Sequence, residues 1–122
     1  MSNMNYRLTL ILNAITIIDK RMKKIKISED FIKDDNGETI LDSINARLQT
    51  IGENANKIPK SDKEFFSLQL QMDPLPIIDF RNIISHEYEL LDYQIIYKIC
   101  TENLFILKQK IETFLSNNNE TV

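Results

Sequence analysis

The sequence predicts an all-α fold, an antiparallel up-and-down bundle of four main helices with one or two short extra helices. Three observations support it: apolar residues recur every three or four positions, no stretch alternates as a strand does, and the chain has only two glycines and three prolines. At 122 residues and 43% hydrophobic content, the chain can close one core but has no room for a second. We therefore expect a single domain over residues 1–115 and a frayed polar tail over residues 116–122.

Two apolar stripes separated by a polar break predict the first two main helices. In the break, residues 28–39, Ser28 is a candidate cap for a short turn and Asn36-Gly37 is a loop signal. The second helix, of about five turns, should end at Ile58-Pro59, because the residue before a proline avoids helical geometry. The first stripe comprises Met4, Leu8, Ile11, Ile15, Ile18, Met22 and Ile25, and the second Ile40, Ile44, Leu48, Ile51, Ala55 and Ile58.

The other two main helices are expected after a connector over residues 61–76. Pro74 and Pro76 exclude a regular helix interior in the connector, so a new helix should begin near Pro76. Asp92 can cap the last long helix. Its stripe comprises Ile96, Ile99, Cys100, Asn103, Leu104, Leu107, Ile111, Phe114 and Leu115.

Composition limits the classes of function. Cys100 is the single cysteine, which excludes an intramolecular disulfide and a cysteine-cluster zinc site and favours a reducing compartment, the cytoplasm. Polar residues interrupt the apolar N-terminal residues 1–20, so we expect neither a signal peptide nor a membrane span. A net charge of -3 argues against binding nucleic acid by overall charge, so any such contact should be local.

The densest positive segment is the run "KRMKKIK", Lys20 to Lys26. Lysines at the end of a helix complement the negative end of its macrodipole, which explains the run without any ligand. A track for nucleic acid is the alternative, and the two explanations are compatible.

One short stretch carries most of the candidate chemistry. The sequence has no glycine-rich phosphate loop and no metal-ligand spacing, so we expect no metal and no cofactor. The stretch "RNIISHEYELLD", Arg81 to Asp92, contains the chain's single histidine, His86, together with Asn82 and Tyr88. By residue type alone, this set can also be the ordinary solvated end of a helix.

Helix geometry restricts how these side chains can act together. Asn82 and His86 are four residues apart and share a face, with Tyr88 on a neighbouring face. Arg81 and His86 diverge by about 140° on an ideal helix. Either the helix is distorted near its end, or two copies of the chain combine their motifs at a twofold interface.

The stretch "RNIISHEY" resembles the motif of HEPN domains, in the variant found in HepT-like toxins. Two further segments support the resemblance: "LQTIGENANKIP", residues 48–59, resembles the family's "IGEA" helix, and "DPLPIIDFRN", residues 73–82, resembles its proline-led start of the motif helix. The chain departs from the family at Asn54, where alanine is usual, and lacks the tryptophan often found before the motif helix.

The resemblance implies a metal-independent endoribonuclease toxin that acts as a homodimer on RNA such as tRNA or mRNA. It implies that Arg81 holds the scissile phosphate, that His86 is the general acid or base, and that Asn82 orients the phosphate or His86. It also implies a type VII toxin–antitoxin system, in which a cognate minimal nucleotidyltransferase neutralises the toxin by AMPylation of Tyr88. Toxin and antitoxin would then form a hetero-oligomer, with no membrane involved.

Two other hypotheses remain at this point. The chain can be a non-enzymatic helical partner that binds a nucleotidyltransferase and assists its binding of nucleotide or substrate. It can also be a dimerising bundle without a site, in which case Arg81→Ala and His86→Ala would have no effect in any assay.

Overall fold

The computed structural model describes residues 3–58 and 93–118, and in this part of the chain every regular element is a helix. The elements are α1 (Asn3–Met22), the 3₁₀ helix η1 (Ser28–Phe31), α2 (Asp35–Asn56), α5 (Tyr93–Lys98), the π-helix η2 (Ile99–Asn103) and α6 (Leu104–Asn118). The all-α prediction is confirmed for these residues. The predicted connector, the helix starting near Pro76 and the cap at Asp92 lie outside them.

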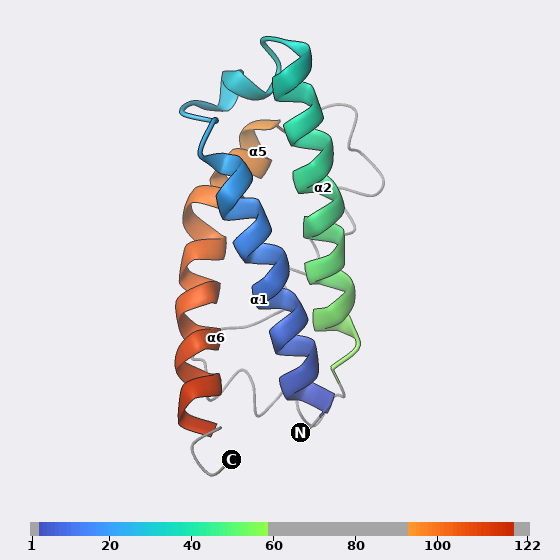
Figure 1. Cartoon of the computed structure of the whole chain (residues 1–122), viewed down its shortest axis with the longest axis vertical. Helices are drawn as coiled ribbons and strands as arrows, with labels where there is room; N and C mark the ends of the chain where they lie inside the picture. The colour runs from blue at the N-terminus through green and yellow to red at the C-terminus, as the bar shows by residue number, and fades with distance from the viewer. Residues whose placement is uncertain (1–2, 59–92, 119–122) are drawn as a thin grey trace.

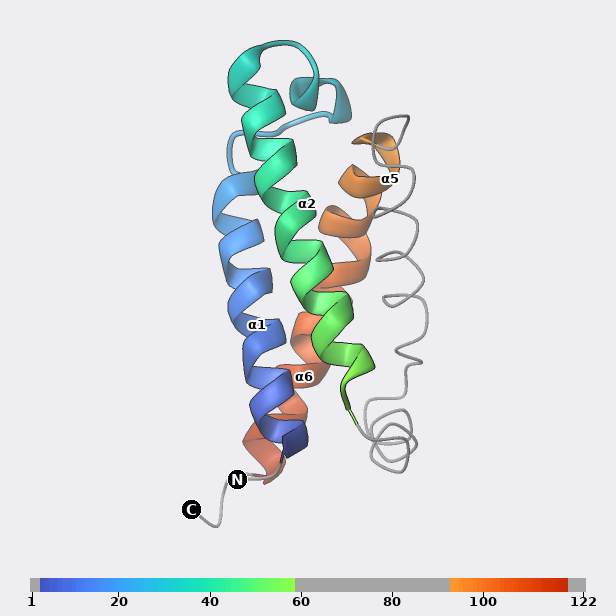
Figure 2. The ribbon, with the colours of Figure 1, turned by 90° about the vertical axis from the view of Figure 1, so that its right-hand side faces the viewer.

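The described helices form a bundle of three long rods (Figure 1). α1 and α2 run antiparallel, and α5, η2 and α6 follow one another directly as one long helix that is antiparallel to α1. Figure 2 shows the same side-by-side arrangement from a second direction. α2 ends at the end of the bundle where α1 begins, whereas α5 begins at the opposite end.

The predicted apolar stripes face one another in the core. Burying each of these side chains contributes about 1.5–3 kcal/mol, which is why amphipathic segments of this length become helices on packing. The most deeply buried residues are Leu8, Ile11, Ile15, Ile18, Phe31, Ile44, Ile51, Ile58, Ile96, Ile99 and Leu104. Ile40, at the start of the second stripe, is only partly buried.

The predicted loop signal at Asn36-Gly37 is wrong, because both residues lie in the first turn of α2. The Asp34 side chain caps the helix by accepting a hydrogen bond from the Gly37 amide at 2.8 Å. Gly37 is buried against η1, where a Cβ atom would overlap the backbone oxygen of Asp30. Glycine is therefore required here by close packing and not by a turn.

The predicted cap at Ser28 is also wrong. Ser28 is the first residue of η1, and the neighbouring Asp30 accepts hydrogen bonds from the amides of Lys26 at 2.7 Å and Ile27 at 3.2 Å. These bonds lower the pKa of Asp30 from its ordinary value, and Lys33 lowers it further by an ion pair at 3.2 Å. An acidic residue three positions into the break, not the hydroxyl at its start, organises the turn.

The last helix follows its predicted stripe but contains a π segment that the sequence pattern did not predict. Residues Ile99–Asn103 take wider π turns, with the Leu104 amide donating to the Ile99 oxygen. α6 then extends to Asn118, so the first residues assigned to the tail are helical. The division into a domain over residues 1–115 and a frayed tail stays a prediction.

Candidate functional site

The four predicted site residues, Arg81, Asn82, His86 and Tyr88, lie outside the residues that the structure describes. Their roles therefore stay predictions. The chain after the motif resumes at Tyr93, the first residue of α5, and only four residues separate Tyr88 from Tyr93 in the sequence. The surroundings of α5 are thus the described part nearest to the motif along the chain.

α5 is fixed against the connection between α1 and α2. The Tyr97 hydroxyl donates a hydrogen bond of 2.8 Å to the backbone oxygen of Lys26, across 71 positions of the sequence. The Tyr97 ring also meets the Phe31 ring edge to face, with centroids 6.5 Å apart and an angle of 77°. The described chain therefore resumes, at Tyr93, at the end of the bundle that carries the basic run.

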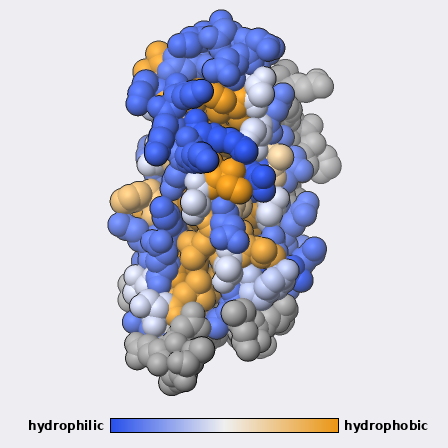
Figure 3. Space-filling model, in the orientation of Figure 1, coloured by the Kyte–Doolittle hydropathy of each residue, from blue (hydrophilic) through white to orange (hydrophobic). Residues whose placement is uncertain are grey.

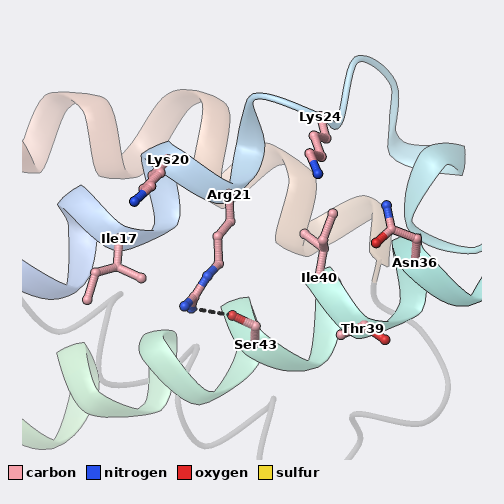
Figure 4. A pocket seen from close by; sticks show the side chains of 8 residues that line it. All are labelled: Ile17, Lys20, Arg21, Lys24, Asn36, Thr39, Ile40 and Ser43. Carbon is pink, nitrogen blue, oxygen red and sulfur yellow. Dashed lines mark hydrogen bonds between the residues drawn. The ribbon is translucent and has the colours of Figure 1, made fainter.

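At this end, a pocket of about 470 Å³ lies between the last turns of α1 and the first turns of α2 (Figure 4). Its lining consists of three cations, three small polar residues and two isoleucines. They are Lys20, Arg21, Lys24, Asn36, Thr39, Ser43, Ile17 and Ile40. The surface here is mostly hydrophilic and encloses apolar patches (Figure 3).

The pocket is positively charged, and its geometry is fixed by a contact between the two helices. The Arg21 guanidinium reaches across from α1 and donates a hydrogen bond to the Ser43 hydroxyl on α2 (Figure 4). The eight lining residues include no carboxylate. Within residues 3–58 and 93–118, the two ion pairs found join other side chains, Lys33 to Asp30 and Lys108 to Asp19.

Sequence analysis identified the basic run but not the polar residues opposite it. Lys20 and Arg21 lie in the last turn of α1, where they complement the helix dipole as predicted. Asn36 and Ser43 complete the pocket from α2. Contacts between two helices leave no spacing signal in a single sequence, so these two residues could not be found from it.

A partly buried polar pair joins α1 and α2 at the opposite end of the bundle. Asn54, which is 8% exposed, accepts a hydrogen bond of 3.1 Å from Arg7 and donates one of 2.9 Å to the Thr50 backbone oxygen. The Nε atom of Arg7 is buried and has no hydrogen-bond partner among the described residues. Asn54, where the family pattern has alanine, is thus the acceptor that permits an arginine to pack at this helix interface.

Cys100 is buried in the core, as its place in the apolar stripe predicts. Burial raises the pKa of its thiol to about 12, and the nearby negative charge of Asp19 adds to the effect. A thiol of such high pKa is a poor nucleophile at neutral pH. Cys100 is therefore a packing residue.

Neither a membrane-spanning helix nor a metal-binding cluster is present among the described residues. None of the helices in that part is both long and apolar enough to span a membrane. The same part of the chain holds no group of three His, Cys, Asp or Glu side chains placed to bind a metal ion.

Comparison with known proteins identifies one family. The family model described as "Ribonuclease HepT-like" matches residues 11–114, most of the chain. Comparison with curated proteins and with solved structures gave no match.

Proposed function

The chain belongs to the HepT-like ribonuclease family, a family of endoribonucleases, and on this premise we propose that it cleaves RNA with Arg81 and His86 of its "RNIISHEY" motif. The observation that carries the proposal is the family match itself, because residues 11–114 include the whole motif from Arg81 to Tyr88. The motif contains the chain's single histidine, so the proposal depends on one side chain that can be tested directly.

The proposed reaction is a transesterification within the RNA. His86 as general base takes the proton of a 2′-hydroxyl, whose oxygen attacks the adjacent phosphorus and forms a 2′,3′-cyclic phosphate. The bond to the 5′-oxygen breaks, and a general acid protonates that oxygen. The guanidinium of Arg81 holds the phosphate and stabilises the negative charge that develops on it. Asn82 orients the phosphate or the imidazole.

A homodimer supplies both proton-transfer groups. Each chain has one histidine, so the acid and the base are His86 of one protomer and the partner's His86. A twofold interface also removes the difficulty that Arg81 and His86 of one helix diverge by about 140°.

We further propose that a cognate minimal nucleotidyltransferase regulates this activity through Tyr88. The phenolic oxygen of Tyr88 would attack the α-phosphorus of ATP, which forms a phosphodiester to AMP, releases pyrophosphate and transfers the phenolic proton to a base. An AMP group two residues from His86 adds bulk and negative charge, both of which oppose RNA binding. The complex of toxin and antitoxin is a hetero-oligomer.

The test is expression of the wild-type chain and of His86→Ala from a tight inducible promoter without the partner. We expect the wild type to arrest growth and fragment total RNA or tRNA, and His86→Ala to do neither while keeping its circular dichroism spectrum. A fully toxic His86→Ala variant would contradict the catalytic role. Intact RNA and normal growth with both chains would favour the alternative of a non-enzymatic partner of a nucleotidyltransferase.

A matched variant separates cleavage from regulation. Tyr88→Phe removes only the hydroxyl that would accept AMP, so we expect it to cleave RNA and to resist neutralisation when the antitoxin is co-expressed. Mass spectrometry of the wild type co-expressed with the antitoxin should show added AMP on Tyr88. Neutralisation of Tyr88→Phe as efficient as that of the wild type would exclude this mechanism.

A further inference from the structure

We propose that the pocket between α1 and α2 binds backbone phosphates of the RNA substrate, which rests on the proposed ribonuclease function and adds a substrate-binding surface to it. The inference starts from the distribution of charge. The chain has 15 Lys and Arg residues against 18 Asp and Glu, so its overall field repels a polyanion. RNA can bind only where cations are locally concentrated, and five of the 15 lie within residues 20–26.

Three of these five cations line the pocket. Lys20, Arg21 and Lys24 line it, whereas Lys23 and Lys26 do not. α1 ends at Met22, so Lys20 lies in its last turns and Lys24 in the turn that follows, and like charges brought to one pocket repel each other. A bound phosphate would relieve this repulsion.

The remaining lining supplies hydrogen-bond donors suited to a phosphodiester. Arg21 is held in place by Ser43, so its other guanidinium N–H groups are pre-positioned for an anion. Asn36 and Thr39 add neutral side-chain donors, and Ile17 and Ile40 supply apolar surface. No carboxylate belongs to the lining, and the acidic residues of the first turn of α2, Asp35 and Glu38, lie outside it.

The surroundings favour a polymer over a free mononucleotide. Arg47 lies one turn beyond Ser43 on the same face of α2, which places a further cation on the side of α2 that lines the pocket. Tyr97 and Lys26 join α5 to the connection after α1, so the pocket lies at the end of the bundle where the chain resumes after the motif. An RNA strand held here would be directed toward that end.

The test is binding of a fluorescein-labelled single-stranded RNA whose 2′-hydroxyls are methylated, so that it cannot be cleaved. Anisotropy is measured with the full chain from 50 to 300 mM KCl. We expect Lys20→Gln/Lys24→Gln to raise Kd about five- to tenfold at the lowest salt and to reduce the slope of log K against log salt by about 1.4, the value for two lost phosphate contacts on a single strand.

The matched control is Lys23→Gln/Lys26→Gln, which changes the net charge equally in the same segment but outside the pocket. We expect it to raise Kd less than about twofold. Equal weakening by both pairs, or no weakening by the pocket pair, would overturn the inference. Displacement of the RNA by AMP at a similar concentration of nucleotide would also overturn it and assign the pocket to free nucleotides.

Cleavage of unmodified RNA distinguishes this inference from the proposed function. If His86→Ala abolishes cleavage while Lys20→Gln/Lys24→Gln binds and cleaves like the wild type, only the pocket inference fails. If His86→Ala cleaves like the wild type, the proposed catalytic role fails, and binding to the methylated RNA still tests the pocket. Circular dichroism melting of each variant shows that the fold is kept.

Discussion

Gly37 shows how one contact reverses an ordinary rule of helix stability. Replacing glycine by alanine inside a helix usually stabilises it by about 1 kcal/mol. At Gly37 the added methyl would overlap the backbone oxygen of Asp30, which cannot rotate away as a side chain could. We expect Gly37→Ala to lower the free energy of unfolding by about 1–3 kcal/mol, the usual cost of overpacking, as measured by urea denaturation.

Thr39→Ala provides the control for Gly37→Ala. Thr39 lies in the same part of α2 and is exposed, so alanine there should be neutral or slightly stabilising. If Gly37→Ala proves as stable as the wild type, η1 does not pack against the start of α2 as closely as described.

Asp30 makes part of the stability depend on pH. Hydrogen bonds from the Lys26 and Ile27 amides, and then the Lys33 ammonium, hold the pKa of Asp30 below its ordinary value of 3.8. A carboxyl group with a lowered pKa in the folded state stabilises the fold above its unfolded pKa, and this contribution is lost as the pH falls through the folded value. We expect Asp30→Ala to be less stable than the wild type at pH 7, and the difference to shrink as the pH is lowered below about 4.

Urea denaturation of both proteins at pH 7 and pH 2.5 measures this difference. Glu29→Ala is the control, because Glu29 is exposed and its carboxylate contacts only the neighbouring Ser28 hydroxyl at 3.0 Å among the described hydrogen bonds. A difference between wild type and Asp30→Ala that is the same at both pH values would mean that the amide bonds do not depend on the charge of Asp30.

At the scale of elements, Arg7 and Asn54 act as one unit between α1 and α2. Asn54→Ala leaves Arg7 without its described acceptor, and the Nε atom of Arg7 already has no partner among the described residues. Leaving a buried polar group unpaired costs about 1–3 kcal/mol. We expect Asn54→Ala and Arg7→Leu each to lower the free energy of unfolding, and Arg7→Leu/Asn54→Ala to lose less than the sum of the two. Strictly additive losses in this double-mutant cycle would show that the two side chains do not interact.

The sequence predicted the main helices well where periodicity alone decides. The stripes from Met4 to Ile18 and from Ile44 to Ala55 are buried as expected. An apolar repeat of about 3.6 residues places all of these side chains on one face of a helix, which then packs against the core. The start of α2 was misjudged, because Gly37 looks like a turn unless its packing against Asp30 is known. Tertiary contact, not local propensity, determined that boundary.

The residues that line the pocket from α1 could be predicted from the sequence, whereas those that line it from α2 could not. The basic run on α1 is evident as a charge pattern, whereas Ser43 and Asn36 are ordinary polar residues until α2 packs beside α1. The π turns of η2 were equally hidden, since the apolar stripe continues through Cys100 and Leu104 with ordinary helical spacing. The sequence shows which polar and charged residues each helix carries, but not which of them come into contact across helices.

At the scale of the whole molecule, one tyrosine ties the first connection of the chain to its last long helix. The Tyr97 hydroxyl donates to the Lys26 backbone oxygen at 2.8 Å, and its ring packs on Phe31 of η1. This contact joins segments 71 positions apart at the end of the bundle where the chain resumes after the motif. Together with the buried Ile96, it fixes α5 against the rest of the bundle.

Tyr97→Phe tests this contact because it removes the hydroxyl and keeps the ring. We expect the free energy of unfolding to fall by about 0.5–1.5 kcal/mol, the net value of one hydrogen bond, in urea denaturation followed by circular dichroism. Tyr6→Phe removes the same atom from an exposed tyrosine on α1 and should change stability by less than about 0.5 kcal/mol. If the two variants are equally stable, the hydrogen bond from Tyr97 to the Lys26 backbone oxygen contributes nothing measurable to stability. A loss confined to Tyr97→Phe would show that a hydroxyl on α5 stabilises the connection between α1 and α2.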